Sequence, residues 1–199
     1  MKKIILSLLV IISANSFSQQ RCGTAERTQM LSENNKEFAI AKQKVNTETK
    51  KWIENNSNYS SKSIITIPVV VHVVWKNSSQ NISDAQILSQ IDILNKDFRK
   101  LNIDTINTPN VWKPISADCK IEFCMASIDP NGNTTTGITR TQTTVNSFAM
   151  NNDPVKSTST GGANPWPSND YLNIWVCKLD NLLGYSTVPS GSLASVIIK

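Results

Sequence analysis

The chain is poor in histidine, because only one of its 199 residues, His72, is of this type. A catalytic zinc centre takes three side-chain ligands, often histidine, and keeps its fourth position open. His72 lies between Val71 and Val73 in an apolar run, so we interpret it as a hydrogen-bonded core residue. No cluster of carboxylates replaces the missing histidines. The sequence therefore predicts no catalytic residue and no metal ligand set in this chain.

Long hydrophobic runs are also absent. The run Ile4–Ile12 is much shorter than the roughly 20 residues that a membrane-spanning helix needs. It follows Lys2 and Lys3 and precedes the small-x-small site Ser16-Phe17-Ser18, which is the pattern of a cleavable secretory signal. We predict a signal peptide over residues 1–18, a secreted product in the extracellular space or periplasm, and no membrane partner after cleavage.

The charges form no long run of one sign. The formal net charge is +5, and loss of Lys2 and Lys3 with the signal leaves +3. Because nucleic-acid binding usually shows as a clustered basic patch, we predict no nucleic-acid partner. The oligomeric state is left open by the sequence.

Cysteine is present at four positions, and an exported chain meets an oxidising environment. Disulfides are therefore favoured over metal thiolates, although four cysteines allow three pairings and the sequence does not choose among them. The candidates for disulfide bonding in the main part of the chain are Cys119, Cys124 and Cys177.

The chain divides near residue 63. Residues 24–56 are polar and carry loosely spaced apolar positions, which indicates one or two amphipathic helices. The Asn-, Ser- and Lys-rich stretch 55–63 has the composition of a linker. We predict an N-terminal segment and linker over residues 19–63 and the main domain over residues 64–199.

The main domain opens with a strand and a helix. Residues 64–75 are mostly β-branched and apolar on both faces, which predicts a strand buried on both sides. Ser83 and Gln86 form a capping box, and the helix that follows carries an apolar stripe made of Ile87, Ile91, Leu94 and Phe98.

Shorter elements follow this unit. We predict a strand at 120–128, a turn at 129–132, a hairpin partner at 134–143, a long surface loop at 144–169, and strands at 171–177, 183–188 and from 195 onward. The predicted fold class is α/β (α+β), with a twisted mixed sheet of four to five strands and one long backing helix.

Six segments of the chain resemble the pappalysin, or cytophagalysin, metalloproteases. They are IPVVVHVVW at 67–75, SDAQILSQIDILNKDFRKLN at 83–102, IEFCMASIDPNGN at 121–133, TTGITRT at 135–141, NDYLNIWVCKL at 169–179 and LLGYSTVP at 182–189. The resemblance implies a metzincin-like upper subdomain preceded by a pro-segment, hence a zymogen. It also implies a protein or peptide substrate.

In this family, three histidines of an H-E-x-x-H-x-x-G-x-x-H helix hold zinc and the Glu acts as general base. We expect that helix beyond Lys199. Zinc is thus expected for the full-length enzyme and not for this chain, which we predict to be inactive alone as an N-terminal part of a secreted zinc metalloendopeptidase. The alternative is a secreted non-catalytic binding module or adhesin.

The resemblance also suggests roles for two short segments. Cys22 resembles the cysteine switch of metzincin pro-segments, in which a thiolate occupies the open zinc position, and a disulfide is the alternative. The segment 183–188 resembles the edge strand that pairs with a peptide substrate, and an ordinary edge strand is the alternative. The substrate-binding candidates are Leu183, Gly184, Tyr185 and Ser186.

Overall fold

The computed structural model describes residues 22–56, 63–188 and 195–198. The predicted signal peptide and most of the predicted linker therefore lie outside the described residues. The N-terminal part forms two helices, α2 (Thr24–Asn34) and α3 (Lys36–Asn55), as predicted. Asn35 separates them and caps α3, because its side-chain oxygen accepts a hydrogen bond of 2.9 Å from the Phe38 amide. Among the helices of the described residues, none has the length and apolarity needed to cross a bilayer.

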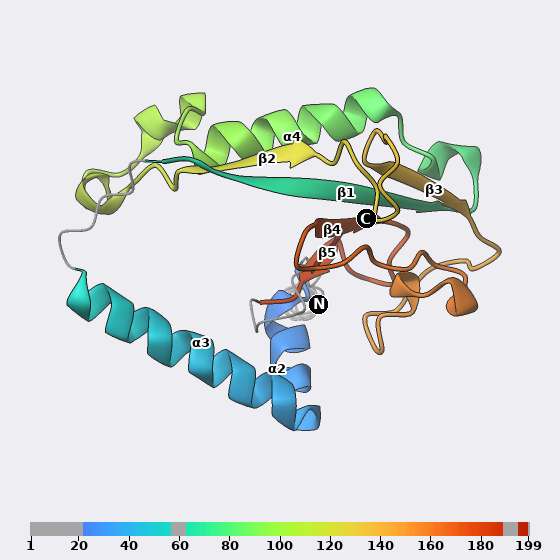
Figure 1. The fold of residues 1–199 in the computed structure, drawn as a ribbon, viewed down its shortest axis with the longest axis horizontal. Helices are drawn as coiled ribbons and strands as arrows, with labels where there is room; N and C mark the ends of the chain where they lie inside the picture. Colours follow the sequence, from blue (N-terminus) through green and yellow to red (C-terminus); the bar gives the residue numbers. More distant parts are fainter. Residues whose placement is uncertain (1–21, 57–62, 189–194, 199) are drawn as a thin grey trace, which may run out of the picture.

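Strand β1 (Ile65–Trp75) is an interior strand of the sheet, paired on both sides (Figure 1). Successive side chains of a strand point to opposite faces. Accordingly, Val71 and Val73 belong to one buried cluster, and Val74 belongs to another. The strand is buried on both faces, as its composition predicted.

The other strands of the sheet are β2 (Ile121–Met125), β3 (Ile138–Gln142), β4 (Leu172–Val176), β5 (Gly184–Ser186) and β6 (Ser195–Ile198). Within the described ranges the order is β2-β1-β4-β6-β5, and β3 also pairs with β1. Because β2 and β3 follow one another along β1, the sheet is five strands wide. Among the pairs of these described strands, only β5–β6 is antiparallel. The prediction of a mixed sheet of this width is confirmed.

The predicted hairpin at 134–143 is wrong. Strand β3 lies parallel to β1 and continues along the edge that β2 leaves, while only an isolated antiparallel bridge joins Ile128 to Thr134. The reason is the length of β1, whose second half keeps free backbone groups beyond the end of β2. Gly137 allows the turn, since its φ is 73° and a Cβ there would lie 2.8 Å from the Ala126 amide nitrogen.

Helix α4 (Asp84–Phe98) covers one face of the sheet (Figure 1). Its first turn is capped by Ser83, whose hydroxyl accepts a hydrogen bond of 3.2 Å from the Gln86 amide, so the Ser83 half of the predicted capping box is confirmed. Ile87 and Ile91 of the predicted stripe are buried against the sheet. Asn95 adds a polar anchor, because its side chain both donates to the Phe123 carbonyl and accepts from the Phe123 amide.

The opposite face of the sheet is covered by residues 144–170. We predicted a surface loop here, which is wrong in part, because Phe148, Met150, Val155 and Ala163 are buried. The segment contains only the short turns η5 (Pro154–Lys156) and η6 (Thr158–Thr160), so its core residues show no periodicity. It packs on Trp175, whose indole donates a hydrogen bond of 2.9 Å to the Ala163 carbonyl.

Candidate functional site

Strand β5 ends the strand order, with β6 on one side and the start of the N-terminal segment on the other. Helix α2 lies against this strand (Figure 1). The predicted substrate-pairing edge and the predicted pro-segment are thus brought together by the fold.

Residues 22–24 occupy the free edge of β5. Cys22 forms an isolated parallel bridge with Gly184, and the Gly23 amide donates a hydrogen bond of 2.9 Å to the Gly184 carbonyl. The Ser186 amide donates a hydrogen bond of 3.0 Å to the hydroxyl of Thr24. Two backbone groups on this edge of β5 are therefore already bound.

The four candidate substrate-binding residues differ in their surroundings. Leu183 is 56% exposed, whereas Tyr185 is 2% exposed and its side chain lies in the core. Gly184 and Ser186 meet the N-terminal segment through their backbones. The Tyr185 hydroxyl donates a hydrogen bond of 2.9 Å to Asp153, and burial, followed by the charge of Asp153, raises the pKa of the phenol.

Asp153 is the centre of a polar cluster beneath the N-terminal segment. Its carboxylate accepts hydrogen bonds from Arg27 at 2.7 Å and from Lys156 at 2.9 Å, besides the one from Tyr185. Lys156 also lies over the Trp175 ring, 5.7 Å from its centroid. Burial lowers the pKa of Lys156, while the nearby Asp153 opposes that shift.

The four cysteines all fall within the described residues, and none of them is bonded to another. Cys22 is exposed, and its thiol donates to the Thr24 hydroxyl over 3.4 Å. The hydrogen bond with the Thr24 side chain, and then that with its backbone, lower the pKa of Cys22. Cys119 and Cys124 are exposed, whereas Cys177 is buried and burial raises its pKa to about 12.

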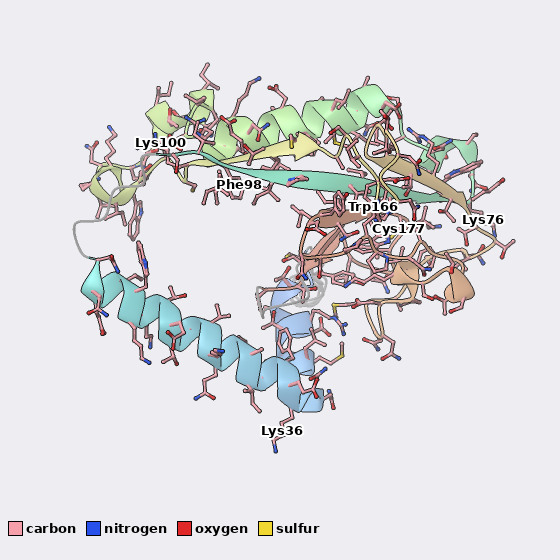
Figure 2. The ribbon with its side chains drawn as sticks, in the orientation of Figure 1. Lys36, Lys76, Phe98, Lys100, Trp166 and Cys177 are labelled. Atoms are coloured by element: carbon pink, nitrogen blue, oxygen red, sulfur yellow. The ribbon has the colours of Figure 1, made fainter. Side chains whose placement is uncertain are left out.

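His72 is the hydrogen-bonded core residue that the sequence predicted. It is 1% exposed, and its two ring nitrogens lie 2.7 Å from the Thr139 hydroxyl and 3.0 Å from Asn173 Oδ1. It packs beside Trp166 and Trp175, and Figure 2 shows Trp166 close to the sheet. Both nitrogens are committed, so His72 is not available as a metal ligand.

No group of three or more His, Cys, Asp or Glu side chains suited to a metal ion occurs in residues 22–56, 63–188 and 195–198. The exposed Cys22 is a soft ligand, but it stands alone. The side chains present therefore do not fit a catalytic zinc site.

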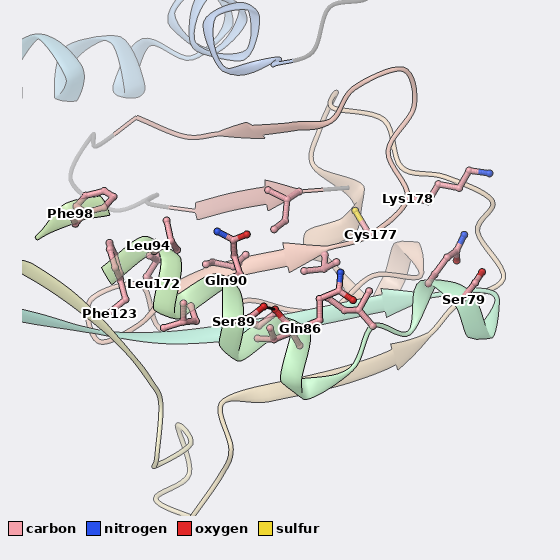
Figure 3. A pocket seen from close by; sticks show the side chains of 18 residues that line it. Ser79, Gln86, Ser89, Gln90, Leu94, Phe98, Phe123, Leu172, Cys177 and Lys178 are labelled. Carbon is pink, nitrogen blue, oxygen red and sulfur yellow. Dashed lines mark hydrogen bonds between the residues drawn. The ribbon is translucent and has the colours of Figure 1, made fainter. Parts of the chain in front are cut away.

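A cavity of about 970 Å³ lies between α4 and the sheet. Figure 3 shows Gln90 and Leu94 of the helix facing this space together with Phe123 and Leu172 of the sheet. Its wall is mainly apolar and contains no acidic side chain and no histidine, so it offers neither a carboxylate nor an imidazole for catalysis.

Sequence reasoning did not find Thr24, Arg27, Asp153 and Lys156 as members of this site. Arg27 and Asp153 are 126 positions apart, and neither belongs to a motif. The one local signal was the turn composition Asn-Asn-Asp-Pro at 151–154, which indicates a bend without naming its partner.

Neither the scan against protein-family models nor the search of curated proteins finds a match. Several chains of solved structures are similar, and three of them are described here. Promirolysin of Tannerella forsythia, mutant E225A, is 44% identical over 90% of this chain and 59% of its own, with a TM-score of 0.74. Mature mirolysin of Tannerella forsythia in complex with a cleaved peptide is 52% identical over 69% of this chain and 53% of its own, with a TM-score of 0.66. Mirolysin in complex with compound 9 gives the same values.

The chain thus spans a little more than half the length of these proteins. Mirolysin is a metzincin-type metalloprotease. The similarity confirms the predicted fold class, a metzincin-like mixed sheet with a long backing helix, over the part of the chain that is matched.

Proposed function

We propose that this chain is the N-terminal part of an exported zinc metalloendopeptidase of the pappalysin type. The observation that carries the proposal is the similarity to promirolysin, at 44% identity over 90% of this chain. The complete enzyme hydrolyses peptide bonds with water activated by zinc. This chain alone is inactive, because its single histidine is bound within the core.

The two forms of mirolysin support a division of the chain into pro-segment and catalytic part. The mature form is matched by 69% of this chain, which is about 137 residues and equals the length of segment 64–199 to within one residue. The proenzyme is matched by 90%, a difference of about 42 residues. Helices α2 and α3 lie in the additional segment expected before residue 64.

Strand β5 is the proposed peptide-binding edge. A solved neighbour, mature mirolysin, holds a cleaved peptide. An extended peptide adds to a sheet edge through backbone hydrogen bonds, and Gly184 and Ser186 offer such groups on the side away from β6. Residues 22–24 occupy that edge here, as a pro-segment that blocks substrate would.

Cys22 is the proposed switch ligand of the pro-segment. Its exposure and lowered pKa favour the thiolate, which is the form that binds zinc. The absence of a bond to Cys119, Cys124 or Cys177 leaves the thiol free for this role. The three histidine ligands belong to the family's zinc-binding helix, expected beyond Lys199.

Determining the coding sequence downstream of Lys199 in all three frames tests the proposal. We expect an H-E-x-x-H-x-x-G-x-x-H helix, and the longer chain should show chelator-sensitive peptide hydrolysis with one zinc per molecule. Downstream sequence without such a helix would favour a secreted binding module or adhesin. Chelator-sensitive hydrolysis by the 199-residue chain alone, with stoichiometric zinc, would contradict its inactivity.

A further inference from the structure

Arg27 connects the N-terminal segment to the domain at a point away from Cys22. We propose that the ion pair between Arg27 and Asp153 is a zinc-independent latch that holds residues 22–28 over the edge of β5. The claim that the latch excludes a peptide rests on the proposed function of β5. The claim that the latch holds the segment is independent of that function.

The receiving site is formed by the domain without help from the segment. Lys156 and Tyr185 both donate to Asp153, each at 2.9 Å, so the carboxylate is held in place from two directions. The side chain of Arg27 is 8% exposed and reaches this carboxylate at 2.7 Å. A guanidinium thus enters a preorganised acceptor, which lowers the entropy lost on docking.

The charges of the cluster make the latch releasable. With Arg27 docked, two cations share one carboxylate, and the buried Nε of Arg27 has no hydrogen-bond partner. A buried donor without a partner costs free energy, so part of the gain from the ion pair is lost. When Arg27 leaves, the ion pair between Lys156 and Asp153 remains, with no net charge. The domain therefore keeps its structure at this site.

The segment that the latch holds occupies two of the backbone groups of β5 that an added strand would use. Gly23 binds the Gly184 carbonyl as a strand amide would. The hydroxyl of Thr24 binds the Ser186 amide in place of a strand carbonyl, because the chain turns into α2 at this residue. Docking of the segment and pairing of another strand on this edge are therefore mutually exclusive.

Close packing at Gly23 fixes the segment in this register. A Cβ at this position would lie 2.9 Å from Leu182 Cδ1 and 2.9 Å from Met150 Sδ. The chain therefore passes directly against side chains of the domain, between the bridge at Cys22 and the ion pair at Arg27.

The test is amide hydrogen exchange of the full chain in zinc-free buffer, followed residue by residue by NMR. The variants are Arg27→Gln, Asp153→Asn and the double variant. Asn tolerates the φ of 47° at position 153. Lys36→Gln, at the exposed start of α3 (Figure 2), is the charge-matched control, and Cys22→Ser separates the latch from the thiol.

We expect protection of the Gly23 and Ser186 amides to fall about tenfold or more in Arg27→Gln and in Asp153→Asn, the effect of losing a charge-assisted hydrogen bond. The double variant should lose no more amide protection than Asp153→Asn does, because both substitutions remove the same ion pair. Lys36→Gln and Cys22→Ser should exchange like the parent chain. Unchanged protection of both amides in Arg27→Gln, or loss of it in Cys22→Ser, would overturn the latch.

Protection of the Val71 amide, which binds the Gly137 carbonyl within the sheet, reports whether each variant is folded. If Asp153→Asn loses that protection, Arg27→Gln decides alone, since Asp153 then keeps Lys156 and Tyr185. The outcome is independent of catalysis. Absence of a zinc-binding helix downstream would contradict the proposed protease function without affecting the latch. Unchanged amide exchange in Arg27→Gln would contradict the latch without affecting the proposed protease function.

Discussion

His72 and Asn173 meet across β1 and β4, 101 positions apart in sequence, with 3.0 Å between Nε2 and Oδ1. Asn173 Oδ1 also accepts from the Trp166 amide, which identifies that atom as the oxygen. The His72 Nε2 therefore donates, and its Nδ1 accepts from the Thr139 hydroxyl. The neutral imidazole is thus held as one tautomer inside the sheet.

This arrangement predicts lower stability in mild acid. Burial lowers the pKa of His72 from 6.5, although the hydrogen bond with Asn173 opposes the shift. Below about pH 6.5 the unfolded chain then binds a proton that the folded chain does not. The free energy of unfolding should fall as pH drops, by up to about 1.4 kcal/mol per pH unit until the folded-state pKa is reached.

Urea unfolding between about pH 5 and 7 measures this slope. In this pH range histidine is the side chain that ordinarily titrates. The chain has no other histidine. His72→Gln is the control, because it removes the titrating group and should flatten the profile. An equal slope in His72→Gln would show that other groups cause it.

Asn173→Ala should be strongly destabilising at neutral pH. The side chain is 1% exposed and forms hydrogen bonds with His72, with the Trp166 amide and carbonyl, and with the Tyr171 carbonyl. Its loss leaves buried polar groups without partners, for a cost of about 2–4 kcal/mol. Urea unfolding measures the change, and the exposed Asn133→Ala should alter it by less than about 0.5 kcal/mol.

The central part of the fold was predictable because its signals are local. The β-branched run of β1, the cap at Ser83 and the stripe of α4 each specify one element from neighbouring residues. The burial of β1 on both faces also follows from composition. These features gave the layered arrangement of helix and sheet before any long-range contact was known.

The rest depended on contacts distant in sequence. Strand β3 pairs with the half of β1 that β2 leaves unpaired on that side. The five residues of β3 alone do not predict this position. The burial of Val155 and Ala163 follows from an uncovered sheet face rather than from periodicity. Likewise, Asp153 joins Arg27 only through the docking of α2, so the ion pair leaves no pattern in the sequence.

Gly162→Ala should destabilise the chain severely, because the backbone of Val155, in the same covering segment, lies directly against this glycine. A Cβ at this position would lie 2.0 Å from the Val155 carbonyl oxygen and 2.4 Å from its carbon, both backbone atoms. Relief requires movement of the segment that covers Trp175, so we expect a loss of about 3 kcal/mol or more. The free energy of unfolding in urea is the measurement.

Gly132→Ala is the matched comparison. Nothing lies within 4 Å of a Cβ there, but φ is 85°, so only backbone strain of about 1 kcal/mol is expected. Equal losses in the two variants would mean that the contact with Val155 relaxes without cost.

Thiol labelling should separate the four cysteines by rate. Cys22 is exposed with a lowered pKa and should react fastest, while Cys119 and Cys124 are exposed and follow. Cys177 is buried with a pKa of about 12, so it should react only when the chain opens. Mass spectrometry of labelled peptides at neutral pH, without reductant, gives the order, and labelling in concentrated guanidinium chloride should reach all four. A smaller total would indicate a disulfide, and Cys177 reacting as fast as Cys119 in the folded chain would contradict its burial beside Trp175.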